Sequence, residues 1–307
     1  MADYGRNLRF GFFPVPHADP AQALRLSVLA DELGLDCVGV QDHPSNPQFM
    51  DSWTLISAIA MRTSRISVFA DVAQLPLRPP SVLAKAHASL DLLTGGRVEL
   101  GLGSGAFADA VAAMGGPRWT AGDGVRAMEE AIQVIRLMWS GERSVEFSGR
   151  YYHLSVEEPG PVPAHRIGIW LGVNGPRALA LTGRLADGWI PGMFPYLKPE
   201  QLAPMAARVD EAARAAGRDP GSIRRIWNIS GTITPRPTGN LFNDSVEGWA
   251  QSLADVSLEH GFDTYLLFEG KDAEAQLRTF ALEVVPLTRH LVDQQRRAMA
   301  AAGETTA

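Results

Sequence analysis

The sequence predicts an α/β protein, a (β/α)8 barrel of the TIM type. Strand-like and helix-like segments alternate eight times along the chain, and such alternation is typical of a parallel sheet covered by helices. The length of 307 residues suits one barrel, which needs about 250 residues plus insertions. An open doubly wound sheet is the alternative, and eight consecutive units make it second choice. We therefore treat residues 1–307 as a single domain.

The predicted strands are short runs rich in β-branched and aromatic residues, bounded by turn residues. In order they are Arg9–Phe13, Cys37–Gln41, Ile66–Ala70, Val98–Gly101, Ile167–Leu171, Gly188–Ile190, Arg225–Ile229 and Thr264–Phe268. The helices predicted between them are Pro20–Leu33, Ser52–Thr63, Pro80–Leu93, Gly124–Trp139, Pro176–Leu185, Pro199–Ala216, Ser245–Glu259 and Asp272–His290. The fourth helix is the clearest, because its apolar residues recur every three or four positions.

Two insertions interrupt this alternation. After the fourth helix, residues 141–166 read as a small hairpin that turns at Ser148–Gly149 and ends in a proline-rich approach to the fifth strand. After the seventh strand, residues 232–244 are rich in turn formers, and either a substrate lid or a passive loop fits them. The alanine-rich tail, residues 297–307, is expected to be flexible.

Composition excludes several classes of function. Apolar residues make up 46% and charged residues 20% of the chain, and the net charge is −6, which disfavours nucleic acid or an anionic membrane as a partner. No signal peptide opens the chain, and no apolar run approaches the ~20 residues of a membrane span. The single Cys37 fits a reducing compartment. We expect a cytoplasmic protein that acts on a small molecule.

Several familiar catalytic patterns are missing from the sequence. There is no phosphate-binding P-loop, no nucleophile elbow and no closely spaced histidine or cysteine pair, so a metal site is unsupported. The loop Gly101–Ala106 matches the loose dinucleotide pattern. That pattern requires an acidic residue at the end of a strand ~20 positions later, and Asp123 opens a helix instead. Dinucleotide binding is therefore disfavoured.

Four groups of residues follow predicted strands, at the barrel end where active sites lie. Asp42–His43 ends the second strand, and Asp71–Gln74 ends the third. Glycines at 101, 103 and 105 follow the fourth, and they let backbone approach something closely. Asn174–Ala178 follows the fifth strand. Pro176 there suits a first helical position, so the amides around Arg177 form a ready anion site.

These residues resemble a known family. The run from Arg78 to Gly105, containing Leu-Asp-Leu-Leu-Thr-Gly-Gly-Arg-Val-Glu-Leu-Gly-Leu-Gly-Ser-Gly, is similar to the motif of the bacterial luciferase-like superfamily. Gln41-Asp42-His43, Trp170–Arg177 and Gly183–Ile190 look like its other landmarks, in the same order. The likeness extends from about Leu8 to Arg289. Within the superfamily the chain most resembles the branch that uses the deazaflavin coenzyme F420, and next the flavin mononucleotide (FMN) branch.

The resemblance implies a role for each matching position. His43 would be the active-site histidine, and the Asp71–Val72 peptide bond would be cis, with Val72 behind the cofactor ring. Cofactor contacts are implied for Asp42, Asp71, Val72, Gln74, Ser104, Gly105, Asp109, Asn174, Gly175, Arg177 and Ala178, the last four at the phosphate.

Two departures from the family bear on the substrate. The sugar-phosphate dehydrogenases of the F420 branch carry a catalytic glutamate where this chain has Ala106, and a phosphate-binding lysine near Pro195. A sugar phosphate is therefore disfavoured. The aromatic and apolar residues nearby predict an apolar substrate pocket instead. These are Phe107, Trp189, Met193 and Phe194.

We accordingly predict hydride transfer between F420 and an organic substrate, with His43 handling the accompanying proton. One alternative is an FMN-dependent monooxygenase that uses O2. Another, of a different class, is a flavin-binding protein without catalysis, and a metal-dependent hydrolase ranks last. The resemblance also implies a homodimer formed through helices of the second and third units.

Overall fold

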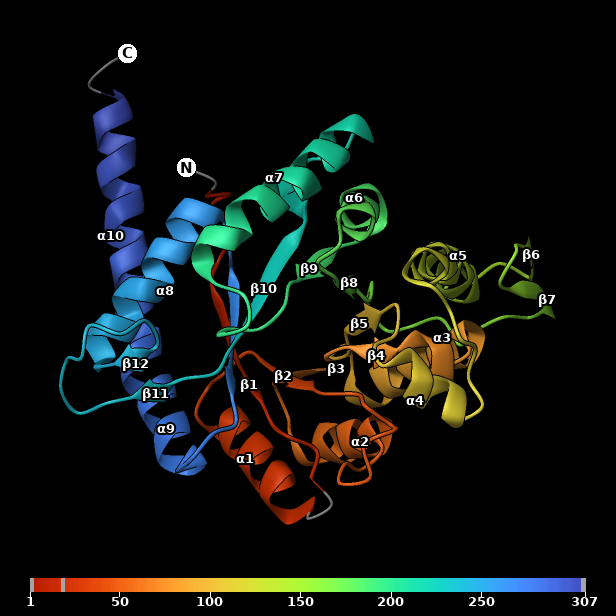
Figure 1. Ribbon diagram of the computed structural model, residues 1–307, viewed down its shortest axis with the longest axis horizontal. Helices are drawn as coiled ribbons and strands as arrows, with labels where there is room; N and C mark the ends of the chain where they lie inside the picture. The colour runs from red at the N-terminus through yellow and green to blue at the C-terminus, as the bar shows by residue number, and fades with distance from the viewer. Residues whose placement is uncertain (1–2, 18–19, 305–307) are drawn as a thin grey trace.

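The computed structural model describes residues 3–17 and 20–304, and within them a parallel barrel occupies the centre of the molecule (Figure 1). Its strands are β1 (Arg9–Phe13), β2 (Cys37–Val40), β3 (Ser67–Ala70), β4 (Ala73–Gln74), β5 (Leu100–Gly103), β8 (Ile169–Gly172), β9 (Gly188–Ile190), β10 (Arg224–Ile229) and β13 (Thr264–Phe268). Their order is β3-β2-β1-β13-β10-β9-β8-β5-β4. A parallel bridge between Val68 and Val98 joins β3 to the residues before β5 and closes the ring. The predicted (β/α)8 architecture is confirmed.

Helices surround the strands in the order that the sequence predicts (Figure 1). The long ones are α1 (Pro20–Glu32), α2 (Ser52–Arg62), α3 (Pro80–Thr94), α5 (Ala121–Met138), α6 (Pro176–Leu185), α7 (Pro199–Ala215), α8 (Val246–His260) and α10 (Val285–Glu304). Inside the barrel, the side chains of Phe13, Cys37, Phe69, Trp170, Ile190, Ile226 and Leu266 form one buried cluster. Packed side chains thus fill the barrel, as expected for this fold.

The structure corrects three predicted elements. The fourth barrel strand begins at Leu100, because Val98 forms only the closing bridge to Val68. A short helix, α4 (Ala108–Ala113), follows the glycine loop and was not predicted. The helix predicted from Asp272 to His290 is divided into α9 (Ala273–Thr279), a π-helical turn at 280–284 and α10.

Residues 297–304 of the tail that is expected to be flexible continue α10, which ends at Glu304. Alanine-rich sequence favours a helix. Arg296 fastens this part of the helix by donating to both carboxylate oxygens of Asp3, at 2.7 Å each, and to the Arg6 carbonyl at 3.0 Å. The remaining residues of the expected tail, 305–307, lie outside the described residues.

Both predicted insertions are present. Strands β6 (Ser144–Ser148) and β7 (His153–Glu157) form the antiparallel hairpin, which projects beside α5 at the right of Figure 1. In the second insertion, β11 (Thr232–Ile233) pairs with β12 (Asn243–Asp244). Phe242 in that insertion is fully buried, with its ring 5.0 Å from Trp249 and 5.1 Å from Phe194. This anchor fixes the base of the loop against the barrel wall.

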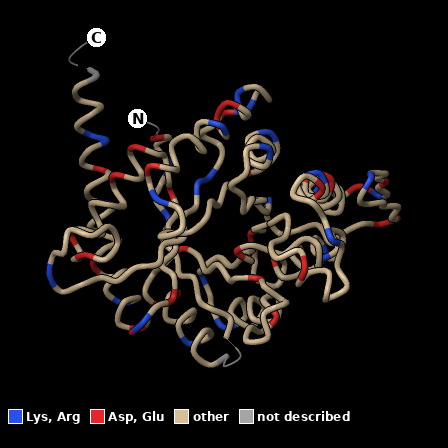
Figure 2. The backbone as a smooth tube through the Cα atoms, viewed as in Figure 1, with Lys and Arg blue, Asp and Glu red and all other residues tan. Residues whose placement is uncertain are grey.

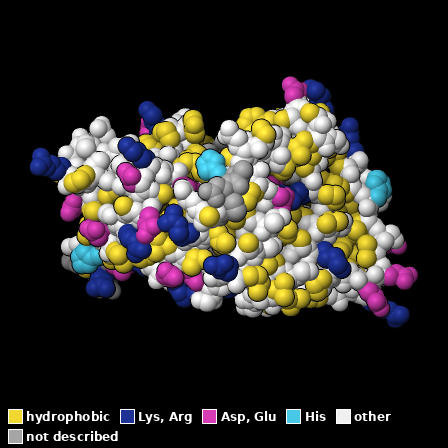
Figure 3. Space-filling view, turned by 90° about the horizontal axis from the view of Figure 1, so that it is seen from below, with side chains coloured by type: hydrophobic (Ala, Val, Ile, Leu, Met, Phe, Trp, Pro, Cys, Tyr) yellow, Lys and Arg dark blue, Asp and Glu magenta, His cyan; other side chains and the backbone are white. Residues whose placement is uncertain are grey.

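The surface carries charges of both signs spread over the outer helices and loops (Figure 2). No helix in the described ranges is long and apolar enough to cross a membrane. Hydrophobic side chains gather on the right half of the view from below (Figure 3), the side that holds α2 to α4 in Figure 1. Exposed large hydrophobic residues on α2 and α3 are Met61, Val82, Leu92 and Leu93.

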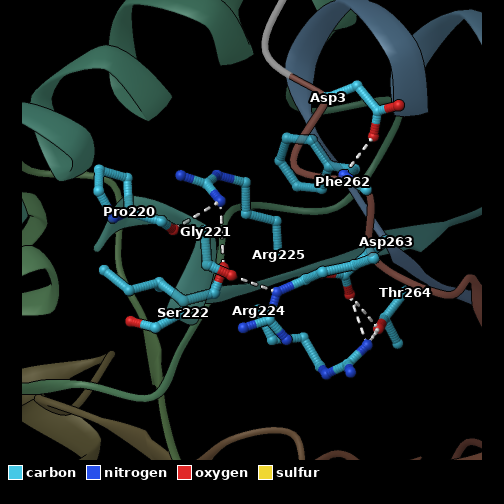
Figure 4. Close-up of polar contacts among 12 residues, drawn as sticks. Asp3, Pro220, Gly221, Ser222, Arg224, Arg225, Phe262, Asp263 and Thr264 are labelled. Carbon is cyan, nitrogen blue, oxygen red and sulfur yellow. Dashed lines mark hydrogen bonds and ion pairs between the residues drawn. The ribbon is translucent and has the colours of Figure 1, made fainter. Parts of the chain in front are cut away.

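Polar side chains close the barrel at the amino ends of β10 and β13 (Figure 4). Arg224 donates to the Asp263 carboxylate at 2.7 Å and to the Thr264 hydroxyl at 3.0 Å. The fully buried Arg225 donates to Asp210 and packs its guanidinium 4.1 Å from the centre of the Tyr4 ring. The guanidinium charge of Arg225 can be buried because the Asp210 carboxylate pairs with it. This network lies at the end of the barrel that contributes stability in such folds.

The glycine loop at the opposite end approaches the β3–β4 connection. A Cβ atom on Gly101 would lie 2.1 Å from the Ala70 carbonyl oxygen, and on Gly103 or Gly172 it would lie 2.7 Å or 2.6 Å from Val72 Cγ2. Real side chains do not tolerate such distances. The glycines predicted to permit a close approach therefore accommodate Val72 and the backbone before it.

Replacing Gly101 with alanine should lower the free energy of unfolding by about 1–3 kcal/mol, because the obstructing atom is backbone and cannot rotate away. Gly270→Ala is the matched control, since nothing lies within 4 Å of its Cβ position and its unfolding free energy should change by less than about 1 kcal/mol. Urea unfolding measures both. Equal effects of the two substitutions would refute the close packing.

Candidate active site

One cavity lies at the carboxyl ends of the barrel strands, with a volume of about 250 Å³. It is lined by Asp42, His43, Asp71, Val72, Ala73, Gln74, Gly103, Ser104, Gly105, Ala106, Gly172, Val173, Asn174, Ile190, Pro191, Gly192 and Asn228. A second cavity of about 210 Å³ shares Ser104 to Ala106 with it and extends to the start of α5. The structure thus brings three of the four predicted groups directly onto one cavity, and Asn174 from the fourth.

Asp42 is held by an arginine inside the protein. Its side chain is almost fully buried, and its two oxygens accept hydrogen bonds from Arg78 Nε and Nη2, each at 2.8 Å. The backbone amide of Gln74 donates to the same carboxylate at 2.9 Å. Arg78 Nη2 also donates a hydrogen bond to Asp51 Oδ2, at 2.8 Å. These donors hold the carboxylate in place and tie it to the loop around Gln74, at the wall of the cavity.

His43 lines the cavity and has one ring nitrogen without a hydrogen-bond partner. Its Nδ1 atom is buried and has no hydrogen-bond partner, and its ring meets that of Phe107 edge to face at 5.5 Å. Burial lowers the pKa of His43 below its ordinary value, and the opposing attraction of Asp42 is weaker. The imidazole is therefore neutral at pH 7 and able to accept a proton.

Asp71 is the second unsatisfied titratable group of the cavity. It directly precedes Val72, and the peptide bond between them is cis, as the resemblance implies. The residue is 7% exposed, and its Oδ2 atom has no partner. Burial raises the pKa of Asp71 to about 7, although a hydrogen bond from the Asn228 side chain opposes that shift. Its carboxyl group is thus partly protonated at neutral pH.

Unsatisfied buried polar atoms concentrate at this cavity. Eight buried side-chain atoms of the described residues lack a partner, and four of them belong to residues that line it. These four are His43 Nδ1, Asp71 Oδ2, Gln74 Oε1 and Asn228 Oδ1. Buried polar groups in proteins are normally hydrogen-bonded. Their concentration in residues that line one cavity marks this end of the barrel as the candidate site.

The amino end of α6, where the sequence predicts an anion site, lies beside the cavity. Gly175 is the N-cap, Pro176 is the first helical residue, and Ala178 is buried behind them. A Cβ atom on Gly122 of α5 would lie 3.6 Å from the guanidinium groups of both Arg177 and Arg126. Arg177 forms no ion pair within the described part of the chain. Free helix amides and an unpaired arginine are suited to a phosphate.

Three of the four residues predicted for an apolar substrate pocket lie outside both cavities. Trp189 is fully buried on the outer side of β9, where its indole donates to the Val173 carbonyl at 2.9 Å. Phe194 is also buried, between Trp227 and Phe242. Met193 is half-buried and does not line the cavity. Successive residues of a strand face opposite sides, and Ile190, next to Trp189, is the residue that faces inward.

Two further predicted residues lie at the rim. Phe107, 67% exposed, stands over His43 and lines the second cavity. Asp109, predicted as a cofactor contact, is exposed on α4 and pairs with Arg118 instead, outside both cavities. Gly175 and Arg177 also lie outside the main cavity, at the amino end of α6. No group of three or more His, Cys, Asp or Glu suited to a metal occurs in the described residues.

Sequence reasoning missed Asn228 and the role of Arg78. Asn228 is the only amide in the otherwise apolar end of β10, two positions after the inward-facing Ile226. Because side chains two positions apart face the same side of a strand, this spacing predicts that Asn228 faces the barrel interior, as Ile226 does. Nothing local in the sequence connects Arg78 with Asp42, 36 positions away.

Comparison with known proteins supports this description. A family model described as luciferase-like monooxygenase matches residues 8–239. An F420-dependent glucose-6-phosphate dehydrogenase of Microbacterium testaceum is 31% identical over 256 residues, which cover 79% of this chain and 73% of that protein. The corresponding protein of Mycolicibacterium fortuitum is 30% identical over 267 residues, covering 83% and 77%.

Solved structures share the fold. An F420-dependent secondary alcohol dehydrogenase in complex with an F420–acetone adduct superposes with a TM-score of 0.81 at 20% identity, over 92% of this chain and 99% of that one. A coenzyme F420-dependent tetrahydromethanopterin reductase from Methanopyrus kandleri has a TM-score of 0.79 at 18% identity, over 92% and 99%. A monooxygenase from Streptomyces bottropensis has a TM-score of 0.76 at 19% identity, over 91% and 99%.

Arg78→Met should lower the free energy of unfolding by about 3 kcal/mol, because it leaves the buried Asp42 charge without its partner. Adding Asp42→Asn to that variant should restore part of the loss, since the amide carries no charge. Urea unfolding of the two single variants and the double variant measures the coupling. Purely additive losses would show that the ion pair does not hold this wall.

Proposed function

The chain belongs to the luciferase-like monooxygenase family, and on this premise we propose that it is an F420-dependent oxidoreductase that transfers hydride between the deazaflavin and an organic substrate. Two observations support the deazaflavin. The related proteins named above are F420-dependent dehydrogenases, similar over about four fifths of this chain. The cavity also combines unsatisfied polar atoms for a ring with an anion site for a phosphate.

The residues present fit such a cofactor. Gln74 and Asn228 line the cavity with amide side chains that suit the polar edge of a ring, and Val72 offers an apolar surface to its face. Ser104 and Gly105, shared by both cavities, would line the path of the side chain, and the α6 amino end with Arg177 would hold the phosphate. When bound, the deazaflavin accepts or gives two electrons as a hydride.

The protein's own contribution is to orient the substrate, exclude water and move one proton. His43, neutral at pH 7, would accept the hydroxyl proton of a substrate that is oxidised, or return it in the opposite direction. Holding both reactants at contact distance supplies much of the acceleration available to such an enzyme.

We propose a substrate without a phosphate group. The relatives named above act on glucose 6-phosphate, yet no Lys or Arg among the described residues lines the cavity. The unpaired Arg177 belongs to the cofactor's anion site in this proposal. Val173, Ile190 and Pro191 offer an apolar surface instead, so a small alcohol or carbonyl compound is better suited to this cavity.

The FMN-dependent monooxygenase is the second candidate, because a monooxygenase shares the fold and an FMN phosphate would suit the same anion site. The two candidates differ in their use of O2, since a 5-deaza ring forms no hydroperoxide. The homodimer stays a prediction. The exposed Met61, Val82 and Leu93 on α2 and α3 favour it, and the native mass in solution decides it.

Purified protein titrated with F420 and with FMN should bind F420 more tightly. Arg177→Met should weaken F420 binding about tenfold, because a hydrogen bond to a charged group contributes about 1.5 kcal/mol. Arg184→Met is the matched control, because Arg184 lies at the other end of α6 and pairs with Glu129. The affinity of this variant for F420 should stay within twofold of the wild-type value. Tighter binding of FMN than of F420 would favour the monooxygenase.

His43→Ala should lower turnover about 100-fold or more and change the dissociation constant of F420 less than threefold, because the residue moves a proton. In the wild type, the rate of substrate oxidation should fall as the pH drops below the ordinary histidine range, since protonated His43 cannot accept a proton. His153→Ala, on the exposed hairpin, is the control. Unchanged turnover in His43→Ala would refute the proton-transfer role.

A further inference from the structure

Phe107 places a large apolar side chain beside His43 and leaves most of it in water. The residue is 67% exposed. Its ring meets the His43 ring edge to face, with 5.5 Å between the ring centres, and it also lines the second cavity. Removing apolar surface from water is favourable, so the ring is available to a ligand that has apolar surface of its own.

The backbone of Phe107 is strained as well. As the N-cap of α4 it has a φ of 57° and a ψ of 59°, in the left-handed region, which a bulky L-residue adopts only at a cost in free energy. Hydrogen bonds on both sides fix this conformation. Gln74 Nε2 donates to the Ala106 carbonyl at 3.2 Å, and the Val111 amide donates to the Phe107 carbonyl at 3.0 Å. Glycine would adopt the same conformation without strain, so neither the backbone nor burial in the core accounts for a phenylalanine at this position. Strained residues of this kind concentrate at ligand sites.

The second cavity has the size and the chemistry for an apolar group. Its volume is about 210 Å³, and benzene binds in a protein cavity of about 150 Å³. Val111 and Trp119 line it beside Phe107, and none of its lining residues, all of which the structure describes, has a titratable side chain. In the proposed function the cofactor side chain passes along Ser104 and Gly105, which leaves the walls formed by the other three residues to the substrate.

We propose that Phe107 determines the substrate specificity of this site by binding an apolar group attached to the carbon that reacts. The inference rests on the proposed function. Because the rings of His43 and Phe107 are in contact, a hydroxyl group that reaches His43 brings the substituents of its carbon beside Phe107. One substituent then lies against the Phe107 ring and enters the second cavity, next to Val111 and Trp119. The preferred substrate is a secondary alcohol with an aromatic or branched substituent, or the matching ketone. A polyhydroxylated substrate is disfavoured, because these walls would remove water from its hydroxyl groups without replacing the hydrogen bonds.

The first test separates binding from folding and needs no substrate. Phe107→Ala removes the ring and keeps the strained backbone, whereas Phe107→Gly removes both. The thermal unfolding midpoint of Phe107→Gly should lie about 2–4 °C above that of Phe107→Ala. Both midpoints should lie within about 5 °C of the wild-type value, because the ring is mostly exposed. A larger fall in both variants would mean that the ring holds the fold together, and it overturns the proposal.

The second test uses F420 with 1-phenylethanol and 2-propanol, which react at the same kind of carbon and differ in the aromatic ring. The kcat/KM of the wild type should be at least about tenfold higher for 1-phenylethanol than for 2-propanol. Phe107→Ala should lower this ratio about tenfold, or about 1.4 kcal/mol, mainly by raising the KM for 1-phenylethanol. The kcat/KM for 2-propanol and the dissociation constant of F420 should stay within about threefold of their wild-type values, because neither depends on the ring.

Two further variants are the controls. Phe107→Tyr keeps an aromatic ring at the same position and should keep the preference for 1-phenylethanol. Met114→Ala removes a side chain that is also exposed, at the C-cap of the same short helix and outside both cavities. The ratio of the two kcat/KM values in Met114→Ala should stay within about twofold of wild type.

A binding measurement tests the same contact without turnover. Acetophenone should raise the thermal unfolding midpoint of the F420-loaded wild type more than acetone does at the same concentration, because a ligand that binds the folded state stabilises it. In Phe107→Ala the two ketones should have equal effects.

The failures of the two proposals are distinguishable. No F420 binding by the wild type overturns the proposed function, and with it the role of Phe107 in that reaction. Binding of F420 together with the same ratio of kcat/KM values in wild type and Phe107→Ala overturns the Phe107 assignment alone. A difference between acetophenone and acetone that is absent from the wild type, or that persists in Phe107→Ala, also overturns it.

Discussion

The site depends on one steric constraint, the fit of the Val72 side chain into a space kept open by three glycines. Gly101, Gly103 and Gly172, on two neighbouring strands, each lie where a Cβ atom would collide with Val72 or with the carbonyl of Ala70. The β3–β4 connection can therefore bulge inward at the barrel mouth and still remain packed. Because the interior is close-packed, the bulge has one allowed position.

That position determines the chemistry of the cavity. The residue before the bulge, Asp71, points into the barrel, and the residue two positions after it, Gln74, donates its amide to Asp42. Arg78, farther along the same connection, completes the bond to Asp42 and reaches Asp51 at the start of α2. One connection between strand and helix thus carries the apolar surface, the free carboxyl and the ion pair that holds the wall.

The sequence allowed much of this to be predicted, because alternating strands and helices specify a barrel and place strand ends at one face. Asp42, His43, Asp71 and Asn174 were found in this way. Predictions failed where they depended on which side of a strand a residue faces. Trp189 looked like a ligand contact, but Ile190 faces inward, and β9 has only three residues from which to judge.

Long-range contacts were the other limit of sequence reasoning. The Arg78–Asp42 pair joins two loops and holds the Asp42 carboxylate at the cavity wall. The helix ending at Glu304 likewise depends on Arg296 reaching Asp3, 293 positions away. Neither partner can be inferred from its neighbours in the chain, since only the closed barrel brings them together.

The electrostatic state of the cavity follows from these contacts. Arg78 cancels the charge of Asp42, burial keeps His43 neutral, and burial keeps much of Asp71 protonated. At neutral pH the free groups therefore include one neutral base and one partly protonated acid, and little net charge lies buried. Desolvating an unpaired charge is costly, so an uncharged resting cavity can receive a flat ring and an apolar substrate at little cost.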